Sequence, residues 1–169
     1  MEVLANLFAA AGSIYILAVM YPLVRIDIRE HRLPNVLVLP AFPITLIGQV
    51  IGCWILFEWQ RVAFSISASI VALLIGLVAN RFASLGMGDV KLIAAAAMAL
   101  GWYSPVSPVL FVFLGFVVAS AVVFVMLLLQ KTTLSNSIAL GPYLLAGFAV
   151  TQILTWSMYF GGFTPYFFM

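Results

Sequence analysis

Long apolar runs separated by short polar connections form the dominant pattern of this chain. The runs are residues 3–24, 36–57, 62–80, 90–103, 106–129 and 138–160. Most of them are close to the roughly 20 residues that a helix needs to cross a bilayer. Short connections favour antiparallel packing of neighbouring helices. The pattern therefore predicts an all-α, polytopic membrane protein, with about six transmembrane helices in one bundle and a single domain over residues 1–169.

The composition leaves no realistic soluble alternative. Hydrophobic residues make up 66% of the chain and charged residues 7%, whereas soluble domains have about 45–50% and about 25%. The single cysteine, Cys53, lies in an apolar run, so it is predicted to be a small, packed side chain. One cysteine and one histidine form no metal-ligand cluster. We therefore expect no metal, no cofactor and no nucleic-acid partner.

The basic residues indicate how the bundle is oriented. Six of the seven lie in the first, third and fifth connections: Arg25, Arg29, Arg32, Arg81, Lys91 and Lys131. Arg61 alone lies in a connection on the other side. The positive-inside rule then predicts a protein of the cytoplasmic (inner) membrane, with the odd-numbered connections in the cytoplasm and both termini outside.

Two aspartates are the candidate catalytic groups. Asp27 lies in the first charged connection, and Asp89 immediately precedes the run at 90–103, so both are expected at the cytoplasmic face. An acid at a membrane border is a functional candidate because its desolvation is unfavourable. Two neighbouring, partly dehydrated carboxylates share a proton. One can then activate water while the other protonates a peptide carbonyl or leaving amine, without a metal, a serine or a cysteine.

The fourth apolar run is unusually short. Its 14 residues, 90–103, would form about 21 Å of helix, against a hydrocarbon core of about 30 Å. Either this helix begins earlier, near Phe82, or the bilayer thins locally. In both cases Asp89 is expected at the membrane boundary, where desolvation raises its pKa.

Three blocks of sequence stand at the predicted helix ends. They are Asp27 followed by Arg32-Leu33-Pro34-Asn35, then Gly86-Met87-Gly88-Asp89-Val90-Lys91-Leu92, and finally Gly141-Pro142-Tyr143-Leu144. Together they resemble the type IV prepilin peptidases, the membrane aspartic proteases with a GxGD motif, over about residues 20–155. A lone GxGD would be a weak signal, but the three blocks in this order are specific. The resemblance implies that Asp27 and Asp89 are the catalytic pair and that the other motif residues support them: Gly86, Gly88, Lys91, Pro34, Asn35, Gly141 and Pro142.

The resemblance also implies a substrate. It would be a prepilin or pilin-like precursor with a short basic leader and a hydrophobic helix, embedded in membrane lipid and cut at the cytoplasmic face. Many family members carry an additional cytoplasmic region with paired CxxC cysteines, which is associated with methylation of the new N-terminus. The single cysteine here makes the chain similar to a minimal, peptidase-only form, as in Tad-type pilus systems and archaeal relatives.

Simpler interpretations exist for each residue. Asp89 could be the N-cap of a helix that begins at Val90. Asp27 could be a solvated charge paired with Arg25 or Arg29. Lys91 could pair with Asp89 or with lipid headgroups. For the remaining motif residues, Pro34 and Gly141-Pro142 could simply open helices, and Asn35 could form a cap or turn. Gly86 and Gly88 have a role in the catalytic interpretation, because they permit a tight backbone that lets a substrate strand or the opposing helix approach Asp89 closely.

A different class of function is a non-enzymatic small transporter or a membrane subunit of a secretion complex. Its border acids would be proton or cation sites. The gathering of the acids at one face and the uncharged outer connection at 101–108 disfavour this interpretation. Gly48 and Gly52, four residues apart, are predicted to pack two helices closely.

Overall fold

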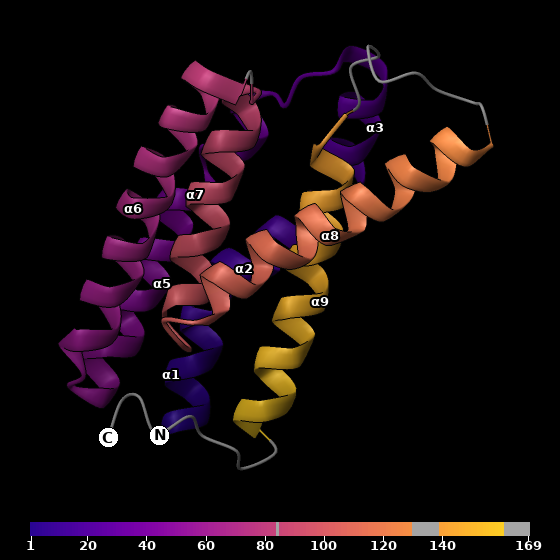
Figure 1. The fold of residues 1–169 in the computed structure, drawn as a ribbon. Coiled ribbons are helices and arrows are strands. Elements are labelled where there is room, and N and C mark those ends of the chain that lie inside the picture. The colour runs from indigo at the N-terminus through magenta and orange to yellow at the C-terminus, as the bar shows by residue number, and fades with distance from the viewer. Residues whose placement is uncertain (84, 130–138, 161–169) are drawn as a thin grey trace.

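The computed structural model describes residues 1–83, 85–129 and 139–160, and within these ranges the chain is a bundle of helices without strands (Figure 1). The helices are α1 (Glu2–Ala9), α2 (Ala11–Ala18), α3 (Met20–Glu30), α4 (Asn35–Val38), α5 (Ala41–Leu56), α6 (Trp59–Ala83), α7 (Met87–Gly101), α8 (Ser107–Leu128) and α9 (Gly141–Phe160). Many large apolar side chains remain exposed on these helices, as expected where lipid is the partner. The all-α membrane class is confirmed.

The described residues contain fewer candidate spans than the six apolar runs of the hydropathy pattern. Three segments of the described ranges are long and apolar enough to cross a membrane: Asn35–Leu56, Trp59–Ala83 and Ser107–Leu128. A fourth candidate combines α2 with α3, which are bent by 47° relative to each other. The first apolar run is thus divided into α1, α2 and α3 instead of forming one helix. Ile138, where the last run was expected to begin, lies outside the described residues, and six spans are not confirmed.

α7 is the central helix of the bundle. It begins at Met87, so the expectation of an earlier start near Phe82 is wrong. Gly86, with ψ 135°, interrupts the helical path after α6 ends at Ala83. The 15 residues of α7 span about 22 Å, and all residues from Leu92 to Gly101 are buried against the surrounding helices. Because α7 contacts protein and not lipid, its length does not have to match the hydrocarbon core.

Small residues allow the helices around α7 to approach closely. A Cβ atom at Gly52 of α5 would lie 2.7 Å from the carbonyl oxygen of Ala5 in α1, and one at Gly48 would overlap the carbonyl oxygen of Phe8. The prediction that these two glycines pack helices is confirmed. Cys53, next to them, is buried and free, as predicted.

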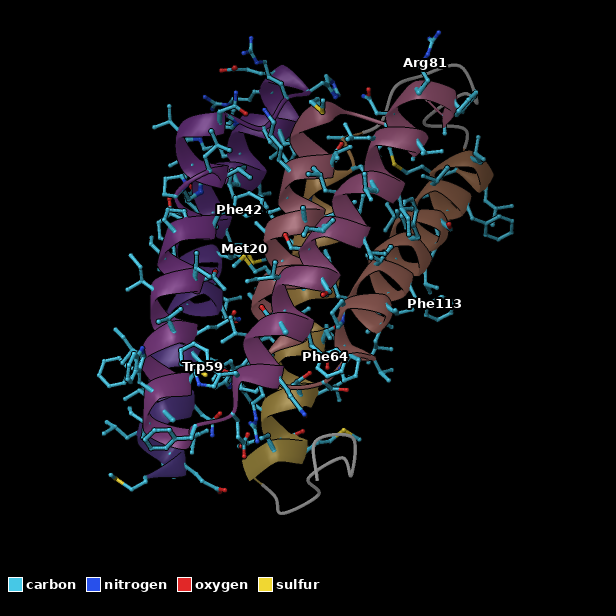
Figure 2. The ribbon with its side chains drawn as sticks, turned by 90° about the vertical axis from the view of Figure 1, so that its left-hand side faces the viewer. Met20, Phe42, Trp59, Phe64, Arg81 and Phe113 are labelled. Atoms are coloured by element: carbon cyan, nitrogen blue, oxygen red, sulfur yellow. The ribbon has the colours of Figure 1, made fainter. Side chains whose placement is uncertain are left out.

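The helix ends form two groups at opposite ends of the bundle (Figure 1). The aspartate end consists of the last turn of α3 and the first turns of α7 and α9. The arginine end consists of α1, the turn between α5 and α6, and the last turns of α7 and α9. Arg81 lies at the aspartate end and Trp59, near Arg61, at the other (Figure 2). The described basic residues therefore separate as predicted, while Lys131 lies outside the described residues.

Candidate active site

Asp27 is held inside the bundle by the last turn of α3. Its side chain is 4% exposed. The backbone N–H of Gly141, the first residue of α9, donates a hydrogen bond to Asp27 Oδ2 at 2.9 Å. The first N–H groups of a helix have no partner within the helix and carry its positive dipole end, so they stabilise a carboxylate. Asp27 is therefore buried and bonded to backbone, and the interpretation as a solvated partner of Arg25 or Arg29 is wrong.

A sharp turn after α3 leads the chain back across the site. His31 ends α3 in the left-handed conformation, with φ 50°, and its N–H donates to the carbonyl oxygen of Asp27 at 2.9 Å. Pro34 then precedes the short helix α4, and its carbonyl oxygen accepts the N–H of Leu37 at 3.1 Å. The predicted helix-start role of Pro34 is confirmed, at the N-cap position.

Asp89 lies in the first turn of α7. The N-cap of this helix is Gly86 and α7 begins at Met87, so the interpretation of Asp89 as an N-cap is wrong. Asp89 Oδ1 is buried and has no hydrogen-bond partner in the described part of the chain. Such atoms are rare in folded proteins because the lost hydration is not replaced. The ionised form of Asp89 is therefore poorly compensated at this oxygen.

The two carboxylates influence each other. Asp89 precedes the apolar run that begins at Val90 and lies outside the membrane-spanning stretch. Burial raises the pKa of Asp89 to about 7, and the nearby charge of Asp27 contributes in the same direction. The expected upward shift is thus present. Two acids that interact in this way titrate as a pair and hold one proton between them over a range of pH.

The glycines of the motifs lie where a side chain would displace part of the site. A Cβ atom at Gly86 would lie 2.8 Å from Asp89 Oδ2, and one at Gly141 would lie 2.6 Å from Asp27 Oδ2. At Gly88 it would lie 2.8 Å from Leu33 Cβ and 3.1 Å from Leu33 N. Gly88 therefore permits the segment after α3 to approach α7, which brings the first two blocks together.

Leu33 is the residue whose importance the sequence did not reveal. It is buried, packs against Gly88, and its Cδ2 would lie 3.3 Å from a Cβ atom at Gly141. It thus contacts the second and third blocks while belonging to the first. The available signal was its position as the single apolar side chain between Arg29 and Asn35.

Polar contacts at the edge of the site involve Lys91 and Asn35. Lys91 Nζ donates to Asn35 Oδ1 at 2.9 Å, and this bond connects α7 to α4. Lys91 is therefore bonded to Asn35 and, among the described residues, not to Asp89. Pro142 is the second residue of α9, and the N–H groups of Tyr143 and Leu144 both bond to the carbonyl oxygen of Leu140. The helix-opening role of Gly141-Pro142 is confirmed.

The comparison with family models decides the identity of this arrangement. A model described as the type IV leader peptidase family matches residues 14–125. The chain belongs to the type IV leader peptidase family. The range matched by the family model contains both Asp27 and Asp89. Gly141, whose N–H bonds to Asp27, lies beyond the matched range. Searches of curated proteins and of solved structures found no match.

Proposed function

We propose that this member of the type IV leader peptidase family is an aspartic endopeptidase of the cytoplasmic membrane that removes the leader of prepilin or pilin-like precursors at the cytoplasmic face. The observation that carries the proposal is the interaction of Asp27 with Asp89, two buried or half-buried acids from α3 and α7. The family match supports a peptidase. The paired acids supply an aspartic mechanism for it.

A pair of carboxyl groups with one shared proton can hydrolyse a peptide bond. The ionised group takes a proton from water as the water oxygen attacks the peptide carbonyl carbon. The protonated group gives its proton to the carbonyl oxygen, and a tetrahedral diol forms. A proton then passes to the leaving nitrogen as the C–N bond breaks, and the products are a carboxylic acid and an amine.

The position of the acids suits a substrate that shares the membrane. Asp89 lies at the start of α7, one residue before the buried apolar stretch. A precursor with a hydrophobic helix would diffuse in the same bilayer, and the junction between its leader and its helix would lie at the level of the two acids. The grouping of basic residues around the aspartate end supports a cytoplasmic location of that end.

The interior between the two ends supports a peptidase more than a transporter. Among the described residues, the buried charged side chains are Asp27 and Arg61, which lie at opposite ends. The buried polar groups between them are hydroxyls and amides, such as Gln49 and Ser65, which bond to each other and to the carbonyl oxygen of Met98. A peptidase requires ionisable groups at the site of cleavage alone.

The test is cleavage of a precursor in cells. A pilin-like precursor is expressed together with the unchanged chain, with Asp27→Asn or with Asp89→Asn, and loss of the leader is followed on a gel. Glu30→Gln is the matched control, because Glu30 is an exposed acid in the last turn of α3. The unchanged chain and the control should process the precursor, and both aspartate variants should not. Undiminished processing by either aspartate variant, at normal protein level, would refute the assignment.

A further inference from the structure

The two carboxyl groups of the pair have different surroundings. Asp27 Oδ2 accepts the Gly141 N–H at 2.9 Å in a buried contact. Asp89 Oδ1 is buried without a hydrogen-bond partner in the described part of the chain. One acid therefore has a fixed donor and the other has an uncompensated oxygen.

The donor on Asp27 favours one ionisation state. A backbone N–H can only donate, and its bond to an ionised carboxylate is stronger than its bond to a neutral carboxyl group. Gly141 is the first residue of the 20-residue helix α9, so the positive end of the helix dipole adds to the effect. Within the described residues Asp89 has no comparable donor, and a buried oxygen without a donor disfavours the negative charge.

We propose that the two aspartates have fixed and different roles: the Gly141 N–H holds Asp27 as the ionised base, and Asp89 carries the shared proton and acts as the acid. The assignment rests on the proposed two-carboxylate peptidase and specifies its direction. Gly141 is a positioning residue in this scheme, since it acts through Asp27.

The other ionisable groups around the pair agree with these roles. Burial raises the pKa of Asp27, while the Gly141 N–H and His31, which ends α3, both act in the opposite direction. Lys91 extends from α7 and is bonded to Asn35. α4 and α9 contain no charged residue. Asp27 therefore has two partners that oppose the effect of burial, whereas for Asp89 burial and the charge of Asp27 both favour the protonated form.

The roles fix the direction of the proton transfers. Asp27 accepts the proton of the attacking water, and Asp89 gives its proton to the carbonyl oxygen of the substrate. When the C–N bond breaks, the proton taken up by Asp27 goes to the leaving nitrogen, and Asp89 recovers a proton from the diol. Each carboxyl group then has its starting protonation state, and the reaction consumes one water molecule.

The composition of the chain makes a direct test possible. Asp27 and Asp89 are the two aspartates of the sequence, so labelling of aspartate carboxyl carbons with carbon-13 gives two signals. The purified chain in lipid nanodiscs is titrated by carbon-13 NMR, and Asp27→Asn and Asp89→Asn assign the signals. We expect the Asp27 signal to show the ionised form at lower pH than the Asp89 signal. Coincident midpoints, or the reverse order, would overturn the assigned roles.

A pair of variants isolates the N–H group. Gly141→Ala and Gly141→Pro both add a Cβ atom near Asp27 Oδ2, but proline alone removes the donor, at a helix position that tolerates it. We expect the carbon-13 signal of Asp27 to titrate with its midpoint at higher pH in Gly141→Pro than in Gly141→Ala. The acidic limb of the pH–activity profile should lie at higher pH in Gly141→Pro as well. Equal midpoints in the two variants would show that the donor does not set the roles.

The experiments distinguish a wrong assignment of acid and base from a wrong proposal of peptidase function. The titration needs no substrate, and precursor cleavage is measured on the same preparation. Cleavage by the unchanged chain together with the reverse titration order overturns the roles and leaves the peptidase intact. Absence of cleavage, with the precursor present and the chain folded, counts against the proposed function itself.

Discussion

The two ends of the bundle both bury a charged side chain, but they differ in how far neighbouring groups compensate the charge. At the arginine end, Arg61 is paired with Glu58, donates to the hydroxyl of Tyr159 at 3.1 Å, and lies over the ring of Trp102 at 5.7 Å. Asn6 completes this cluster, because its amide donates to Tyr159 at 3.0 Å and accepts the indole N–H of Trp102 at 2.9 Å. The charge is compensated from several helices.

At the aspartate end, the charge of Asp27 raises the pKa of Asp89 further, and one buried oxygen of Asp89 has no hydrogen-bond donor among the described residues. A compensated charge connects helices, whereas an uncompensated one raises the free energy of the ionised form and keeps a proton within reach at neutral pH. The comparison suits an arginine end that holds the bundle together and an aspartate end that performs the proposed chemistry. Each of the following predictions separates these two roles.

The largest expected effect is on cleavage at the aspartate end. Asp27→Asn or Asp89→Asn should lower the rate of precursor cleavage by about 10²–10⁴-fold, because general acid–base catalysis contributes that much. Neither substitution should lower the melting temperature in detergent at pH 8, since each removes one of two facing charges. A large loss of melting temperature would show that these acids stabilise the fold instead.

The converse effect is expected at the arginine end. Arg61→Ala should lower the free energy of unfolding by about 1–3 kcal/mol, because it leaves Glu58 and buried polar groups without their partner. Cleavage per folded molecule should remain unchanged. Thermal unfolding and the cleavage assay, measured on the same sample, check both statements. The control is Arg81→Ala, an exposed residue, for which a change within about 0.5 kcal/mol is expected.

Substitution of one glycine at each end sharpens the contrast. Gly88→Ala would push its Cβ atom against Leu33, and Gly52→Ala would push its Cβ atom against the Ala5 carbonyl oxygen. Both should destabilise the chain by about 1–3 kcal/mol through overpacking. Gly88→Ala alone should also lower cleavage per folded molecule, by about tenfold, since displacement of a positioned group by ~1 Å is enough. Equal specific activities would show that Leu33 does not position the site.

Stability should depend on pH through Asp89. The pKa of Asp89 is raised to about 7 from its ordinary value of 3.8, so between these values the folded state holds a proton that the unfolded state has released. Stability should therefore fall as the pH rises from about 4 to about 7 and then level off. Asp89→Asn should lack this decline and melt a few degrees higher than the unchanged chain at pH 8. Parallel melting curves for the two proteins across this range would contradict the prediction.

The smallest effect is expected for the bond between Lys91 and Asn35. Because it lies at an exposed edge, Lys91→Ala and Asn35→Ala should each lower the free energy of unfolding by about 0.5–1 kcal/mol. The double variant should lose less than the sum, because both single changes remove the same bond. Strict additivity in thermal unfolding would show that the bond contributes nothing.

The sequence by itself determined the class of the protein and the candidate residues. Hydropathy is a local property, so the apolar runs at 62–80 and 106–129 located α6 and α8 to within a few residues. The basic residues Arg81 and Arg61 were likewise assigned to opposite ends, and Figure 2 shows Arg81 at one end and Trp59, which is close to Arg61 in the sequence, at the other. The motif blocks around Asp27 and Asp89 are short and contiguous, which is why they could be recognised before any contact was known.

Only the tertiary structure decided how these parts meet. The division of the first apolar run at Ala10 and Val19, and the shielding of α7 from lipid, depend on neighbouring helices that no local pattern describes. The same is true of Leu33 between the blocks and of the bond from Gly141 to Asp27, which joins residues more than one hundred positions apart. Apolar runs specify helices because burial acts on each residue, whereas the ionisation of a carboxyl group depends on which distant donor the fold places beside it.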